Sequence, residues 1–192
     1  MLMFKRISFT AAIFASAAAP AFAHLNPAEH GSVLAGISHP LTGPDHIMAM
    51  VAVGLWASQQ GGKALYAVPA AFVGTMAIGF LLALAGVHLP FVEPAILASV
   101  MALGLLVATA VRMPAGGASA VVALFALFHG YAHGTELAGA GALEFGLGFL
   151  IATAFLHAVG IGLGVGLNRF GPRITRLLGV ATALGGAALM LG

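Results

Sequence analysis

The fold is decided by the stretch Ser38-His39-Pro40-Leu41-Thr42-Gly43-Pro44-Asp45-His46, which places two histidines and an aspartate inside an apolar run, residues 33–56. An ionisable side chain at membrane depth costs roughly 2.5–3.5 kcal/mol on insertion scales, so it marks an ion or substrate path by default. The stretch therefore predicts a functional site inside a membrane-embedded segment.

The same stretch predicts a break in the helix. Pro40 removes a backbone donor and disfavours helix at His39, whereas Pro44 suits the first turn of a new helix. We expect a discontinuous first span, with His39 at the end of its first half and Asp45 and His46 in the opening turn of its second. Transporters place ion sites at such breaks, because irregular backbone is tolerated at depth where it lines a protein-enclosed cavity.

Composition limits the chain to the membrane class. Of its 192 residues, 61% are hydrophobic and 6% are charged, whereas a soluble domain has about 25% charged residues. The net charge of +2 comes from scattered single residues, which argues against nucleic acid as a partner. The chain has no cysteine, so thiolate metal sites and cysteine nucleophiles are excluded, and it lacks the G-x-x-x-x-G-K-[ST] loop that would bind a nucleotide.

The N-terminal residues 1–23 have the pattern of a cleavable signal peptide. Lys5 and Arg6 supply the charged region, residues 7–19 the apolar region, and residues 21–23 an A-x-A cleavage site. Cleavage there leaves His24 as the mature N-terminus outside the cytoplasm. The alternative is an uncleaved first anchor.

We expect an all-α integral membrane protein, with residues 24–192 forming a single domain of six transmembrane helices. The expected spans are residues 33–56, 64–87, 94–111, 118–133, 143–167 and 174–191. The linkers between them alternate between the two sides of the membrane. One side receives the basic residues Lys63, Arg112, Arg169, Arg173 and Arg176, and the other receives every acid except Asp45. The positive-inside rule then predicts an inner-membrane protein whose mature N- and C-termini are periplasmic.

A second polar cluster, Phe128-His129-Gly130-Tyr131-Ala132-His133-Gly134-Thr135-Glu136, lies at the outer end of the fourth expected span. His129 and His133 are four residues apart and share a helix face, which Glu136 joins if the helix persists. In the expected topology this cluster and the first one lie at the same level near the outer leaflet. We therefore expect the two clusters to meet.

Together the clusters offer a nitrogen and oxygen ligand set without sulfur, consisting of His39, Asp45, His46, His129, His133 and Glu136. Imidazole with carboxylate suits Ni²⁺, Co²⁺, Zn²⁺ or Mn²⁺, and affinity alone does not choose among these ions. Each part also has a structural explanation. Asp45 alone is explained as an acid favoured by the helix dipole, and His129 with His133 as buried histidines bonded to carbonyls.

Four further residues are candidates for an accessory role along the pathway. Phe72 is either core or a constriction, and Glu93 is either a solvated loop acid or an outer attractor for cations. His157 is either satisfied by packing or a deeper relay position, and His24, if N-terminal, can chelate through its amine and imidazole. The repeated glycines of residues 160–166 serve either helix packing inside the bundle or a homo-oligomer contact.

These residues resemble a known family. The motifs His39-Pro40-Leu41-Thr42-Gly43-Pro44-Asp45-His46, Met50-Val51-Ala52-Val53-Gly54-Leu55-Trp56 and residues 128–136 are similar to the signatures of the HupE/UreJ family of nickel permeases. The resemblance implies uptake of nickel, or in some members cobalt, for hydrogenase or urease maturation. It also implies that the residues at a set of matching positions are important for function, namely His39, Asp45, His46, Phe72, Glu93, His133 and Glu136.

The sequence therefore predicts a secondary permease or facilitator, not an enzyme. Its substrate would be Ni²⁺ or Co²⁺, carried from periplasm to cytoplasm with the lipid bilayer as its surroundings and no prosthetic group. The alternative is an intramembrane hydrolase, in which zinc held by histidine and aspartate activates water. That reaction needs a spare general base, for which Glu136 or Glu93 is available.

Overall fold

The computed structural model describes residues 31–137 and 141–191, which form helices and, within those ranges, no strand. The expected signal peptide, residues 1–23, and His24 lie outside the described residues. The helices are α2 (Val33–Thr42), α3 (Pro44–Gln60), α4 (Ala64–Leu84), α5 (Val92–Thr109), α6 (Ala115–Glu136), α7 (Ala142–Leu167), the short 3-10 helix η2 (Asn168–Phe170) and α8 (Pro172–Leu191).

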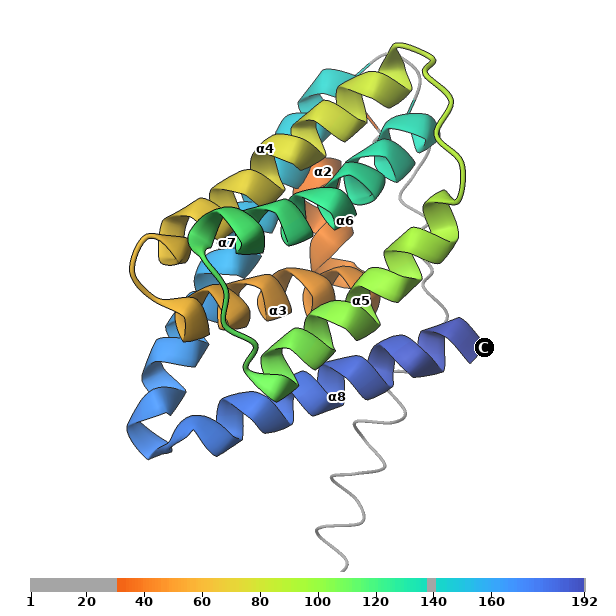
Figure 1. The fold of residues 1–192 in the computed structure, drawn as a ribbon. Helices are drawn as coiled ribbons and strands as arrows, with labels where there is room; N and C mark the ends of the chain where they lie inside the picture. The colour runs from red at the N-terminus through yellow and green to blue at the C-terminus, as the bar shows by residue number, and fades with distance from the viewer. Residues whose placement is uncertain (1–30, 138–140, 192) are drawn as a thin grey trace, which may run out of the picture.

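Helices α2 and α3 meet at Gly43, where the chain changes direction (Figure 1). Pro40 lies inside α2 rather than at its end, because the Gly43 N–H and the Thr42 hydroxyl both donate to the His39 carbonyl and extend the helix past the proline. Pro44 has no N–H for the Pro40 carbonyl, so α2 cannot continue, and the fixed φ of Pro44 starts α3.

Five described helices are long and apolar enough to cross a membrane, namely α4, α5, α6, α7 continued through η2, and α8. Helices α2 and α3 have 10 and 17 residues and are each shorter than a full span. The protein is therefore an all-helical, multi-pass membrane protein.

Helices α2 and α3 run parallel to α7 and touch it closely. A side chain on Gly36 of α2 would collide with the Phe145 backbone, and one on Gly54 of α3 would collide with the His157 carbonyl. The contact with α7 therefore moves toward higher residue numbers on both sides, as it does for parallel helices. Within the glycine repeat, Gly160 faces α3, whereas Gly162 faces open space. The repeat thus packs α7 inside the bundle on one of its faces.

The remaining helices form two further close pairs. Helix α6 runs parallel to α4, because Gly130 and Gly134 lie against the backbones of Met76 and Phe80 respectively. Helix α8 lies alongside α5 in the opposite direction, with Gly104 against Ala183 (Figure 1). Neighbouring backbones approach this closely only where a side chain is absent, which explains the high glycine content of these spans.

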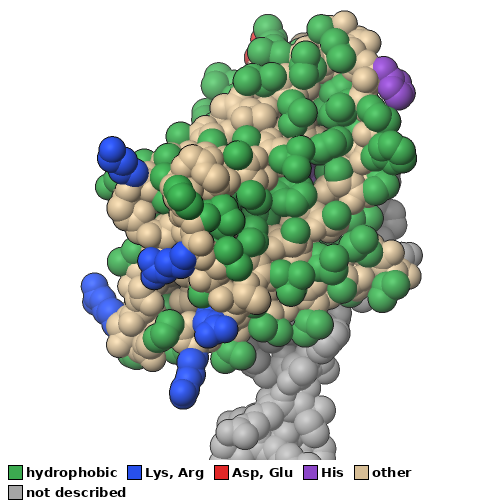
Figure 2. Space-filling view, viewed as in Figure 1, with side chains coloured by type: hydrophobic (Ala, Val, Ile, Leu, Met, Phe, Trp, Pro, Cys, Tyr) green, Lys and Arg blue, Asp and Glu red, His purple; other side chains and the backbone are tan. Residues whose placement is uncertain are grey.

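The charged residues separate to opposite ends of the bundle. The C-termini of α3, α5 and α7 meet the N-termini of α4, α6 and α8, and the linkers and flanks at this basic end carry Lys63, Arg112, Arg169, Arg173 and Arg176. Figure 2 shows Lys and Arg side chains gathered along one end of the visible face, with hydrophobic side chains over the rest. The opposite, acidic end carries Glu93, Glu136 and Glu144.

Candidate metal centre

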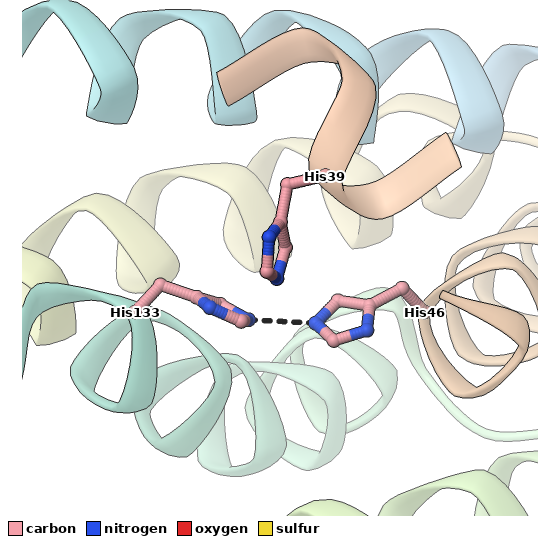
Figure 3. Close-up of side chains that lie close together, drawn as sticks. All are labelled: His39, His46 and His133. Atoms are coloured by element: carbon pink, nitrogen blue, oxygen red, sulfur yellow. Dashed lines mark hydrogen bonds between the residues drawn. The ribbon is translucent and has the colours of Figure 1, made fainter. Parts of the chain in front are cut away.

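Three histidines from three helices converge near the acidic end of the bundle. His39 lies in the last turn of α2, His46 in the first turn of α3 and His133 in the last turn of α6. One ring nitrogen from each lies within 4.8 Å of the other two. Figure 3 shows the three rings pointing toward one another. The two sequence clusters therefore do meet, and the helix break at Gly43 puts His39 and His46 on the same site.

The spacing of this three-histidine cluster suits a single ion. The Nε2 atoms of His46 and His133 are 2.6 Å apart, and the ring centroid of His39 lies 4.6 Å from that of His133 and 5.5 Å from that of His46. Imidazole nitrogens bind a zinc ion at about 2.0–2.1 Å, so two nitrogens on one ion lie roughly 3 Å apart. Small ring rotations would bring all three nitrogens onto one ion.

Two carboxylates lie behind this cluster and do not face into it. Glu136 Oε2 is 3.1 Å from Nδ1 of His133, and Asp45 Oδ2 is 3.0 Å from Nδ1 of His46, although the second pair is not aligned as a linear hydrogen bond. Metal-binding histidines characteristically present their second nitrogen to a carboxylate, which fixes the tautomer and makes the ligand more basic. The sequence grouped both acids with the ligands, whereas here each contacts the far side of an imidazole.

The hydrogen bond to Glu136 bears on which nitrogen of His133 can bind an ion. A carboxylate only accepts hydrogen bonds, so Glu136 favours a proton on Nδ1 of His133 and a free lone pair on its Nε2. Nε2 of His46 faces that lone pair at 2.6 Å, a hydrogen-bond distance at which His46 can donate to His133. A cation that took the place of this proton would bind both nitrogens.

Aromatic side chains of α7 enclose the cluster. The Phe149 ring centroid lies 4.5 Å from that of His133 and 6.0 Å from that of His39, and the Phe145 ring lies 5.7 Å from His39. Phe149 is 1% exposed. These rings keep water from the apolar side and strengthen electrostatic interactions inside the site. Nothing in the sequence separated these two phenylalanines from the others.

The other predicted site residues lie at different depths. His129 is one helical turn from His133, with its ring 5.7 Å from that of His46, and it bonds to Ser99, the sole polar residue in the middle of α5. Phe72 and His157 are buried farther toward the basic end. Glu93 is exposed in the first turn of α5, where no described hydrogen bond or ion pair joins it to these histidines.

Comparisons with known proteins agree with the motifs. The family model described as HupE / UreJ protein matches residues 12–189. The chain is 49% identical to Protein HupE of Rhizobium leguminosarum bv. viciae over 181 residues, which cover 93% of this chain and 95% of that protein. No solved structure matches this chain.

Proposed function

The chain belongs to the HupE/UreJ family, and on that premise we propose that it is a permease that moves Ni²⁺, or Co²⁺, across the inner membrane into the cytoplasm. The observation that carries this proposal is the three-histidine cluster, in which His46 and His133 are each backed by a carboxylate. Hydrogenase or urease maturation would consume the metal.

The ligand chemistry supports a borderline divalent cation. The cluster offers imidazole nitrogens and no sulfur, which suits Ni²⁺ and Co²⁺ and gives no advantage to Cu⁺. Three imidazoles, two of which have a carboxylate beside the second nitrogen, also make a site of moderate affinity. Conduction requires such moderation, because an ion that is held too tightly does not leave.

The direction of transport is inferred from charge. All five basic residues outside the first 30 positions lie at one end, and by the positive-inside rule that end is cytoplasmic. The three-histidine cluster near the acidic end would then face the periplasm. Since α2 with α3 runs parallel to α7, which is long enough to span, the broken pair would make the sixth crossing and leave both termini periplasmic.

The membrane potential would supply the driving force. Moving one charge through 100 mV is worth about 2.3 kcal/mol, so a dication gains about 4.6 kcal/mol on entering the cytoplasm. Glu93, exposed at the acidic end, would raise the local concentration of cations before they reach the cluster. His24, if it is the mature N-terminus, would act in the same way.

Uptake of ⁶³Ni²⁺ into proteoliposomes tests the proposal. We expect the parent protein to accumulate the metal and His46→Ala to lose most of the flux. His88→Ala is the matched control, because His88 is an exposed histidine on the α4–α5 linker. Equal flux in the parent and in His46→Ala would contradict the proposal, as would the absence of flux in both, which is the result expected of a metallohydrolase.

No observation favours that hydrolase. Its general base would have to be Glu136 or Glu93, yet the Glu136 carboxylate is bonded to His133 and Glu93 is exposed at the end of α5. Neither carboxylate is free beside the three imidazole nitrogens.

A further inference from the structure

His129 carries a buried nitrogen that the three-histidine cluster does not use. Its Nε2 lies 2.8 Å from Ser99 Oγ, and that hydroxyl lies 2.6 Å from the Ile96 carbonyl oxygen. A carbonyl only accepts, so the one hydroxyl proton of Ser99 is donated to Ile96. Ser99 must then accept from His129, which puts the ring proton on Nε2 and leaves Nδ1 unprotonated. Nδ1 is buried and has no hydrogen-bond partner among the described residues.

His157 presents the same situation from α7 with its two nitrogens exchanged. Its Nδ1 lies 2.8 Å from the carbonyl oxygen of Met50 on α3 and must therefore donate. Nε2 is left unprotonated, buried and, in the described part of the chain, without a partner. His157 is 1% exposed and His129 is fully buried.

Both rings lie against Phe72, which is itself fully buried. The Phe72 ring centroid is 5.9 Å from that of His129 and 5.0 Å from that of His157. His129 in turn lies 5.7 Å from His46 of the three-histidine cluster. Successive imidazoles thus lead from the cluster toward the middle of the bundle, and the last two both contact the Phe72 ring.

Packing alone does not account for this arrangement. A buried acceptor without a partner costs about 1–3 kcal/mol, and an apolar side chain of similar shape would avoid that cost. Here the penalty occurs twice, and in each ring the opposite nitrogen is held by a hydrogen bond that selects the tautomer. Metal-binding histidines are oriented by a bond of this kind at the second nitrogen.

We propose that His129 and His157 form a second, deeper station for the transported dication, which meets Nδ1 of His129 and then Nε2 of His157 as it passes the Phe72 ring that both imidazoles contact. This inference rests on the proposed transport function. With one imidazole nitrogen at each step and no backing carboxylate, the station binds the ion more weakly than the three-histidine cluster does. It therefore passes the ion on toward the basic end without trapping it.

Two matched substitutions test the station without removing the bonds that hold the rings. His129→Gln places an amide N–H close to the position of Nε2 and keeps the donor to Ser99. His157→Asn places one close to the position of Nδ1 and keeps the donor to Met50. Each deletes only the free nitrogen. Thr153→Val is the control, because it removes a buried polar group from the same helix as His157.

The first measurement is ⁶³Ni²⁺ uptake beside equilibrium binding of ⁶³Ni²⁺ to the purified full-length protein. We expect His129→Gln and His157→Asn to lose at least tenfold in uptake rate while the tighter Kd changes less than threefold, and Thr153→Val to match the parent. Parent-like uptake in both variants would overturn the station while leaving the permease proposal intact. Absence of uptake by the parent would instead refute the permease.

The second measurement does not depend on transport. With the three-histidine cluster disabled by His46→Ala, we expect a residual, weaker Co²⁺ site that is visible by its ligand-field absorption and lost on adding His129→Gln. Residual binding that is the same in the double variant would overturn the proposal. Ser99→Ala supplies a second route if His129→Gln does not fold, because it leaves the imidazole in place but frees its tautomer, and it should weaken the residual site severalfold.

Discussion

The two carboxylates behind the three-histidine cluster should differ in how strongly they affect metal affinity. Removing a carboxylate at the second nitrogen of a ligating histidine typically weakens metal binding 10- to 100-fold, or about 1.4–2.8 kcal/mol. The Glu136 side chain is 55% exposed and that of Asp45 is 27% exposed. Solvent screens the more exposed pair, so we expect about a tenfold loss for Glu136→Gln and a loss approaching 100-fold for Asp45→Asn.

The substitutions separate charge from hydrogen bonding. Glutamine at position 136 still accepts from Nδ1 of His133 and loses only the negative charge, whereas Glu136→Ala loses both. Affinity should therefore fall in the order parent, Glu136→Gln, Glu136→Ala. The assay is equilibrium binding of ⁶³Ni²⁺ to purified protein in nanodiscs, repeated at 1 M salt. The Debye length there is about 3 Å, so salt screens the Glu136 charge and the difference in affinity between the parent and Glu136→Gln should become smaller.

Either of two results would refute this reasoning. A loss far beyond 100-fold for Glu136→Gln would mean that the carboxylate binds the ion directly, as the sequence alone had grouped it. Unchanged affinity in both Glu136→Ala and Asp45→Asn would mean that the carboxylates do not tune the imidazoles at all.

Two further predictions concern glycines. Gly43→Ala should leave the melting temperature near that of the parent, because Gly43 has φ −81°, which alanine adopts readily. It should weaken metal binding severalfold, because the new Cβ would lie 2.9 Å from Nδ1 of His46. Unchanged binding would contradict the geometry of that turn. Gly160→Ala should lower thermal stability by about 1–3 kcal/mol, as overpacking does, because its Cβ would meet the α3 backbone. Gly162→Ala should be neutral, because its Cβ would enter open space. Equal effects of the two substitutions in a melting assay would refute the inferred packing of α7.

Much of this protein can be predicted from sequence because its polar residues are so few. Apolar composition alone predicts a helical membrane protein, and the motifs around His39 and His133 identify the family, which the comparisons confirm. The spacing of Pro40 and Pro44 also places an interruption close to Gly43. The motif and proline signals are local, since each depends on residues within about one or two helical turns.

Side-chain direction could not be predicted in the same way. Asp45 is adjacent to His46 in sequence, which made it a natural ligand, yet its carboxylate lies at the outer nitrogen of that ring. The tautomer of His129 depends on Ser99, 30 positions away on another helix, and on how that serine uses its single proton. Such facts depend on which helices are neighbours, and no local pattern contains them.

The helix break explains why a short, unusual turn can make a metal site. His39 and His46 are seven residues apart, so on one continuous helix they would share a face but be separated by about 10 Å along the axis. That distance is too long for one ion to bind both rings. With α2 ending at Thr42 and α3 starting at Pro44, their ring centroids are 5.5 Å apart. The two prolines and Gly43 therefore bring together two ligands that a regular helix would hold apart, while α6 supplies the third.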